Sequence, residues 1–143
     1  MRLRRAFTLV EILIVVVILG ILSALGVPQF SKVTQEASSG ATVDQLVKIR
    51  DALGVYYVRQ NAWPQIQAGD GTWGELITVG GDYMRRPPQN KWVDPAVAST
   101  IILRDTPDTS YTAPSPAYGW IFSSHGDVWA AGFDASDKPF PHP

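Results

Sequence analysis

Ser124, His125 and Asp127 are side chains of the types that serve as nucleophile, general base and orienting acid in hydrolases. Such a triad is gathered by folding from separate elements, whereas these three residues lie in one short predicted hairpin turn. The sequence contains no phosphate-binding glycine loop, nucleophile elbow or H-E-x-x-H motif. It also contains no cysteine, which excludes thiol catalysis, disulfides and thiolate metal centres. We therefore predict that the chain is not an enzyme.

A second group of interest is one carboxylate, Glu11, inside an apolar run. The run from Phe7 to Val27 comprises 21 residues with no other charge. A helix of that length measures about 30 Å, the thickness of the hydrocarbon core of a membrane. Residues 1–6 hold three arginines and no acid, so this end is expected in the cytoplasm. We predict a single span of the inner membrane, with the following residues in the periplasm or outside the cell.

Glu11 is costly in such a span. An acid at the centre of a membrane helix costs about 2.5 to 3.5 kcal/mol, and less near its ends. Glu11 lies in the second turn of the apolar run, so two readings stay open. The carboxylate is either solvated near the headgroups or paired with a cation from another chain.

The net charge bears on the class of partner. The 143-residue chain has 12 basic and 13 acidic side chains, a net charge of −1, and the part beyond residue 6 has a net charge of −4. A protein with this balance does not attract polyanions, so we expect no binding to nucleic acid.

The residues from Arg4 to Glu11, RRAFTLVE, and the apolar stretch after them resemble the class III signal of type IV pilins and type II secretion pseudopilins. In that family a prepilin peptidase cuts between a small residue and Phe, and the new amino terminus is methylated. The resemblance implies cleavage between Ala6 and Phe7 and N-methylation of Phe7. The family prefers Gly at the position of Ala6, and some members have Ala.

Cleavage would create a partner for Glu11. The new ammonium at Phe7 of one subunit can pair with Glu11 of a neighbour in apolar surroundings. Each subunit then carries both halves of a head-to-tail contact, which does not close on itself and builds a helical filament. The resemblance implies further partners: a prepilin peptidase and methyltransferase, minor pilins or pseudopilins, and an inner-membrane assembly platform.

Pro28 follows the apolar run. A proline inside a helix removes a backbone donor and clashes with the preceding turn, so we expect a bend or a local loosening near Gly26. The family has a helix-bending proline here, and the resemblance implies that Pro28 contributes to assembly and that residues 20–28 melt in filaments. The alternative is that Pro28 only marks the exit from the membrane.

Beyond residue 30 the pattern becomes amphipathic. Apolar side chains recur at helical spacing, which indicates a helix packed on a head: Val43, Leu46, Val47, Ile49, Leu53, Tyr56 and Tyr57. No strong helix stop precedes Asn61. We predict four segments: a cleaved leader over residues 1–6, a transmembrane or filament-core helix over 7–30, an amphipathic helix over 31–58 and a globular head over 59–143.

Three strands are predicted in the head, over Thr100–Arg104, Tyr118–Ser123 and Asp127–Phe133. The last two flank Ser124-His125-Gly126, which is a hairpin signal. A short helix is expected over Thr72–Ile77. The predicted fold class is α+β, a long N-terminal helix packed on a small antiparallel sheet. We attribute the five Trp and five Tyr to an aromatic core rather than to ligand stacking.

The head resembles the major pseudopilin subtype in three short fragments: Asn61 to Pro64, Tyr83 to Pro88 with Trp92, and Gly119 to Phe122 with Gly126 to Asp134. Pseudopilins have a calcium loop near the end of the head, and Asp134 and Asp137 match its position. The resemblance therefore implies calcium, which takes six to eight oxygen ligands. A solvated acidic tail is the alternative.

Together these features predict a structural subunit of a type IV-like filament, of the major pseudopilin type in a type II secretion system. Within the same family, the alternative is a surface type IV pilin for adhesion, motility or DNA uptake. From another class, the alternative is a membrane-anchored periplasmic binding module or enzyme.

Overall fold

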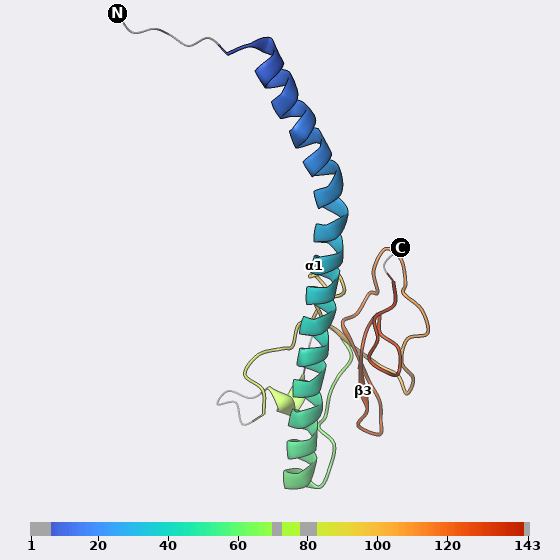
Figure 1. The fold of residues 1–143 in the computed structure, drawn as a ribbon. Coiled ribbons are helices and arrows are strands. Elements are labelled where there is room, and N and C mark those ends of the chain that lie inside the picture. The colour runs from blue at the N-terminus through green and yellow to red at the C-terminus, as the bar shows by residue number, and fades with distance from the viewer. Residues whose placement is uncertain (1–6, 70–72, 78–82, 142–143) are drawn as a thin grey trace, which may run out of the picture. The chain divides into compact units, whose positions relative to one another are not determined.

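The computed structural model describes residues 7–69, 73–77 and 83–141 (Figure 1). Residues 1–36 and 37–143 form two compact units, called unit 1 and unit 2. The elements in chain order are the helix α1 over Leu9–Gln60, the 3-10 turn η1 over Gly74–Leu76, and the strands β1 over Ile101–Leu103, β2 over Trp120–Phe122 and β3 over Val128–Ala130. The predicted α+β class, with a long N-terminal helix and a small sheet, is confirmed.

The backbone of α1 is helical through Pro28. Instead of the local loosening expected near Gly26, the helix continues without a break from Leu9 to Gln60. The side chains of residues 25–29, Pro28 among them, lie outside the described residues. The role of Pro28 in assembly stays a prediction.

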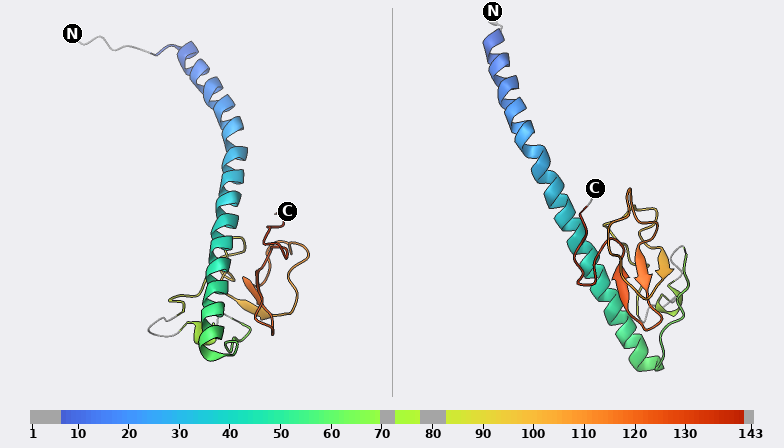
Figure 2. Two further views of the ribbon diagram at one scale, coloured as in Figure 1. Left: turned by 60° about the horizontal axis from the view of Figure 1, so that its bottom comes forward. Right: turned by 90° about the vertical axis from the view of Figure 1, so that its right-hand side faces the viewer.

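In unit 2, α1 turns one narrow stripe of apolar side chains inward: Leu46, Ile49, Leu53 and Tyr56. The spacing of three and four residues keeps them on one helix face, and Figure 2 shows the strands beside this part of α1. Val47 and Tyr57, predicted on the same face, are 48% and 42% exposed. Each follows a buried residue by one position, which turns its side chain away by about 100°.

α1 ends where Asn61 leaves helical geometry. Asn61 has a φ of 53° and its N–H donates to the carbonyl of Tyr57 at 2.8 Å. Asparagine tolerates this left-handed conformation, which is a common way to end a helix. Trp63 then folds back so that its ring centroid lies 4.5 Å from that of Tyr57. The absence of a helix stop before Asn61, read from the sequence, is confirmed.

The short helix predicted over Thr72–Ile77 is reduced to η1. Thr72 lies outside the described residues, and η1 covers only Gly74–Leu76. Gly74 has a φ of +52°, and a Cβ there would lie 2.0 Å from the carbonyl oxygen of Gln65. Close packing against this backbone, rather than helix propensity, shapes the turn.

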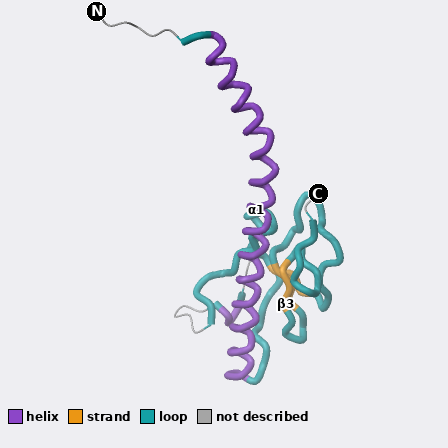
Figure 3. The backbone as a smooth tube through the Cα atoms, viewed as in Figure 1, coloured by secondary structure: helices purple, strands orange, loops and turns teal. Residues whose placement is uncertain are grey.

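The sheet has the strand order β1-β2-β3. Figure 3 shows its strands in orange. β2 and β3 pair antiparallel with Trp120 opposite Ala130, so the predicted hairpin is confirmed. β1 pairs parallel to β2 with Ile101 opposite Trp120, and the expectation of a fully antiparallel sheet is wrong at this pair. Parallel neighbours need a connection of roughly a dozen residues or more, and residues 104–119 are long enough to return the chain to the same end of the sheet.

The core of unit 2 is rich in aromatic rings, as the Trp and Tyr content predicts. Trp73 meets Phe122 and Trp120 edge-on, with ring centroids 5.3 Å and 6.1 Å apart. The indole N–H of Trp73 donates to the carbonyl of Ser99 at 3.1 Å, and that of Trp120 to the carbonyl of Ala98 at 3.0 Å. These rings are therefore buried with their polar edges paired.

Candidate assembly site

The segment from Phe7 to Glu11, where the sequence predicts processing and subunit contact, opens unit 1. Phe7 precedes α1 and its side chain is 79% exposed. Ala6 lies outside the described residues, so the structure describes the predicted cleavage junction on its Phe7 side. The exposed ring leaves this side open to another molecule.

Thr8 and Glu11 cap the start of α1 reciprocally. The backbone N–H of Glu11 donates to Thr8 Oγ1 at 3.3 Å. In return Glu11 Oε2 accepts the backbone N–H of Thr8 at 2.8 Å and its hydroxyl at 2.9 Å. This arrangement is a capping box, which satisfies donors that the first turn of a helix leaves without partners. We did not predict it from the sequence, although the Thr-x-x-Glu spacing before an apolar run is its signal.

The capping box occupies one of the two carboxylate oxygens of Glu11. Within the described residues both bonds to the side chain end on Oε2, and an ionised carboxylate has a second oxygen with its own lone pairs. Lys32 is the only basic side chain among residues 7–36, and roughly 30 Å of helix separates it from Glu11. A cation for Oε1 has to come from the residues before Thr8 or from another molecule.

The rest of unit 1 presents an apolar surface. Every large hydrophobic side chain from Leu9 to Leu22 is at least 50% exposed. An apolar surface of this extent is typical of a protein or membrane contact. Among the residues that the structure describes, none of the helices combines the length and the hydropathy required to cross a membrane. The span over residues 7–27 stays a prediction.

Ser124 and His125 do not form a triad with Asp127. Ser124 Oγ lies 3.2 Å from His125 Nδ1, and the carboxylate beside them is that of Asp105. Asp105 Oδ1 also lies on the Nδ1 side of the imidazole, at 3.8 Å, whereas a triad places the acid on the opposite ring nitrogen from the serine. Hydrogen bonds from the backbone N–H and then the hydroxyl of Ser124 lower the pKa of Asp105. The group holds the hairpin turn, as predicted for a structural role.

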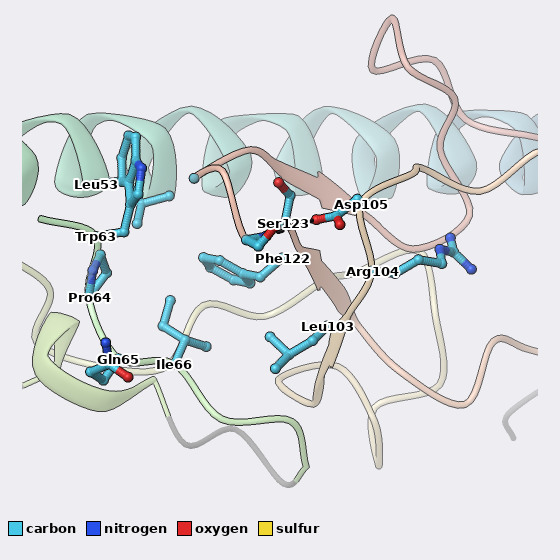
Figure 4. A pocket seen from close by; sticks show the side chains of 12 residues that line it. Leu53, Trp63, Pro64, Gln65, Ile66, Leu103, Arg104, Asp105, Phe122 and Ser123 are labelled. Carbon is cyan, nitrogen blue, oxygen red and sulfur yellow. Dashed lines mark hydrogen bonds between the residues drawn. The ribbon is translucent and has the colours of Figure 1, made fainter.

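A pocket adjoins this turn (Figure 4) and is lined mainly by apolar side chains, among them Trp63, Ile66 and Phe122. Its two charged side chains have partners within the protein. Arg104 donates to Asp108 Oδ1 at 2.5 Å, and Asp105 accepts the bonds from the turn. Since both charges are engaged, we assign no chemistry to this pocket.

Asp134 and Asp137, the acids expected to bind calcium, are both engaged by other groups. Asp134 Oδ1 accepts the N–H groups of Ser136 and Lys138 at 2.7 Å and 3.0 Å. Asp137 forms a two-point ion pair with Arg50, Nη1 to Oδ2 at 2.5 Å and Nη2 to Oδ1 at 2.9 Å. In the described part of the chain, no three His, Cys, Asp or Glu residues gather to hold a metal. The residues present therefore do not fit a calcium ion.

Arg50 is not among the residues that the sequence predicts on the buried face of the amphipathic helix. It stands four residues after Leu46 and three before Leu53, both buried, so it lies at the edge of the buried stripe. From there its guanidinium reaches Asp137 and also donates to the carbonyl of Val128 at 3.0 Å. The position beside a buried residue is the only signal for this contact in the sequence, because no spacing rule connects residue 50 with residue 137.

Comparison with known proteins gives the family. Residues 1–27 match the model described as the prokaryotic N-terminal methylation motif. The chain is 31% identical over 102 residues to type II secretion system core protein G of Aeromonas hydrophila, with 66% of this chain and 71% of that protein covered. The chain belongs to the core protein G family. The core protein G of Klebsiella pneumoniae is 32% identical over 100 residues, with 64% and 71% covered.

Other matches agree with membership of the core protein G family. The type IV major pilin protein of Neisseria gonorrhoeae is 28% identical over 83 residues, with 58% of this chain and 50% of that protein covered. No solved structure matches the chain significantly. The predicted pilin-like filament subunit is therefore confirmed at the level of the family.

Proposed function

We propose that the chain is the major pseudopilin of a type II secretion system, cut between Ala6 and Phe7 and polymerised through its N-terminal helix. The capping box carries this proposal, because it holds the Glu11 carboxylate at the start of an exposed apolar helix, and among the described residues both bonds to this carboxylate end on Oε2. The match to core protein G extends over 102 residues, far beyond the 27 residues of the methylation motif, and so includes residues of the head.

Cleavage supplies the missing cation. In the uncut chain the nitrogen of Phe7 is a neutral amide, and in the cut chain it is an ammonium. Pairing this ammonium with Oε1 of Glu11 in a neighbour satisfies both charges in apolar surroundings, where either one alone is costly. The exposed side chains from Leu9 to Leu22 then pack against neighbouring helices. Repeating one such unsymmetrical contact builds a filament.

The remaining roles belong to other proteins. Before assembly, the apolar run of 21 residues anchors the subunit in the inner membrane with its head in the periplasm. A prepilin peptidase and methyltransferase processes the N-terminus. Minor pseudopilins and an inner-membrane platform start and drive the filament, so the chain itself is a structural subunit and not an enzyme.

A type IV pilus subunit is the second candidate, and the similarity to the Neisseria gonorrhoeae pilin favours it. The two candidates differ in where the filament ends. A pseudopilin filament lies in the periplasm and supports export of secreted proteins, whereas a pilus extends from the cell surface. Deletion of the gene followed by assays for exported proteins and for surface fibres separates them.

The decisive experiment determines the N-terminus of assembled material. We expect the mass of purified filament subunits to correspond to a chain that begins at methylated Phe7. Glu11→Val is expected to insert into the membrane and to assemble poorly, whereas Lys32→Gln, a charge change elsewhere in unit 1, leaves assembly intact. Filaments whose subunits begin at Met1 would refute the processing step. Normal filaments from Glu11→Val would remove the carboxylate from the contact, and a monomeric chain with an intact N-terminus would indicate an anchored binding module or enzyme.

A further inference from the structure

We propose that Arg50 takes the place of a bound cation in the C-terminal loop, residues 133–138, so that the head of this pseudopilin folds without calcium. The resemblance to pseudopilins implies a calcium ion at this loop, and the residues present do not fit one. The structure places a guanidinium from α1 against Asp137, one of the two acids to which the metal was assigned.

Arg50 forms a two-point ion pair with Asp137 and one further hydrogen bond to the backbone. Arg50 Nη1 and Nη2 each donate to a different oxygen of Asp137, at 2.5 Å and 2.9 Å. Nη2 also donates to the carbonyl of Val128 at 3.0 Å, in strand β3. Planar guanidinium and carboxylate groups match in this geometry, which makes the bonds shorter and stronger than those of a single-point pair. The side chains of Arg50 and Asp137 are 39% and 26% exposed, so solvent screens the pair only in part.

The loop is also closed by its own backbone. The N–H of Asp134 donates to the carbonyl of Lys138 at 2.9 Å, and the N–H of Asp137 donates to the carbonyl of Asp134 at 3.1 Å. Asp134 Oδ1 accepts two further N–H groups of the loop. Several oxygens that a metal would need are thus directed at backbone donors of the loop itself.

A calcium ion would have to compete with the guanidinium for the same atoms. Both oxygens of Asp137 and the carbonyl of Val128 accept bonds from Arg50. Seating a dication there would strip Arg50 of these three bonds and place it beside a like charge. Calcium would gain few of the six to eight oxygens that it requires. The internal cation therefore excludes the external one.

The loop matters because it follows a buried anchor. Phe133 is fully buried and meets Trp92 edge-on, with ring centroids 5.9 Å apart. Phe140, beyond the loop, donates its N–H to the carbonyl of Gly132 at 2.9 Å. Arg50 ties this C-terminal segment to α1 and to β3 at once, which is the structural role that a metal ion would otherwise have.

The first test measures calcium dependence of the whole processed chain in detergent. Thermal unfolding is followed by circular dichroism, and hydrogen exchange of residues 131–141 is followed by mass spectrometry, in excess EGTA and in millimolar calcium chloride. We expect the same unfolding temperature and the same exchange in both solutions. A higher unfolding temperature in calcium, or slower exchange of the loop, would overturn the proposal.

The second test removes the guanidinium. Arg50→Gln is expected to lower the unfolding temperature by roughly 4 to 8 °C in a domain of this size and to speed exchange in residues 131–141. Asp137→Asn should have the same two effects. The unfolding temperature of the double variant should be no lower than that of the less stable single variant, because the two side chains serve one contact. Lys48→Gln is the control, since Lys48 and Asp44 form an exposed pair with side chains 58% and 61% accessible.

Two outcomes would contradict the role of Arg50. One is an Arg50→Gln chain with the unfolding temperature and the hydrogen exchange of the wild type. The other is a double variant whose decrease in unfolding temperature equals the sum of the decreases in the two single variants. Arg50→Lys is made alongside, because it keeps the charge and loses the two-point geometry. We expect the unfolding temperature of Arg50→Lys to lie between those of the wild type and Arg50→Gln. The EGTA comparison on the wild type needs no variant and stands if Arg50→Gln does not fold.

Discussion

A Cβ atom on Gly126 would lie 2.4 Å from the indole ring of Trp63, so the turn between β2 and β3 reaches that ring only because residue 126 is glycine. Trp63 in turn stacks on Tyr57 near the end of α1. This chain of contacts fastens the tip of the hairpin to the helix. It also explains why a glycine with a φ of +89° stands at this position.

Gly126→Ala is therefore expected to destabilise the head by about 2 kcal/mol or more, because it combines steric overlap with a strained backbone. The free energy of unfolding in urea measures the loss. Gly54→Ala is the matched control: the position is in α1 with nothing within 4 Å of an added Cβ, so we expect a gain of up to about 1 kcal/mol. Equal effects of the two substitutions would show that the contact with Trp63 is unimportant.

Asn90 should be among the most sensitive positions in the head. Its side chain is fully buried, and Nδ2 donates to the carbonyls of Gly119 at 2.8 Å and Ala131 at 3.0 Å. Oδ1 accepts the N–H of Trp92 at 2.8 Å and the hydroxyl of Thr42 at 3.2 Å. Asn90→Leu keeps the size of the side chain but removes the bonds to the N–H of Trp92 and to the carbonyl of Ala131, at about 1 to 3 kcal/mol for each buried group left unsatisfied.

We expect Asn90→Leu to lower the free energy of unfolding by about 3 kcal/mol or more, measured by urea denaturation. Gln89→Leu is a control one residue away, because Gln89 is only partly buried and its amide makes one long bond of 3.5 Å to Pro87. A loss at Asn90 no larger than that at Gln89 would contradict the role assigned to the buried network.

Tyr56 makes the head sensitive to alkaline pH. Its hydroxyl donates to Glu75, and this hydrogen bond, followed by burial, raises the pKa of Tyr56 to about 12 from a usual value of 10.0. The protonated phenol is thus favoured in the folded state, so its contribution is complete below pH 10 and is lost as the pH rises towards 12. Tyr56→Phe is expected to be less stable than the wild type at neutral pH. The difference in the free energy of unfolding should vanish between pH 10 and pH 12.

Urea midpoints collected between neutral pH and pH 12 test this expectation, together with the absorbance of phenolate groups. Tyr57→Phe, at an exposed position, should keep the pH dependence of the wild type. A difference between Tyr56→Phe and the wild type that stays constant up to pH 12 would show that the bond to Glu75 does not control the titration.

The capping box predicts a local effect at the start of α1. Thr8→Val removes the oxygen that accepts the N–H of Glu11, at a cost of about 1 kcal/mol for the loss of an N-cap. We expect faster hydrogen exchange at the amide of Glu11 in the processed chain in detergent. Thr8→Ser keeps the hydroxyl and should exchange like the wild type. Similar exchange in all three chains would mean that Thr8 does not cap the helix.

Several features could be predicted from the sequence because they depend on neighbours along the chain. The apolar run around Glu11, the end of the helix at Asn61 and the hairpin through Gly126 each have their signals within a few residues. The leader and the first residues of the run were sufficient to indicate the family, since the motif is continuous over residues 1–27.

Only the tertiary structure decided the rest. The parallel pairing of β1 follows from the path of a long connection, and the partner of Ser124 is Asp105, 19 residues away, rather than Asp127. Arg50 and Asp137 are 87 residues apart, so no local pattern joins them. A sequence shows that two acids stand near each other in a loop, but that an arginine pairs with Asp137 depends on which side chain the packing of the helix brings within bonding distance.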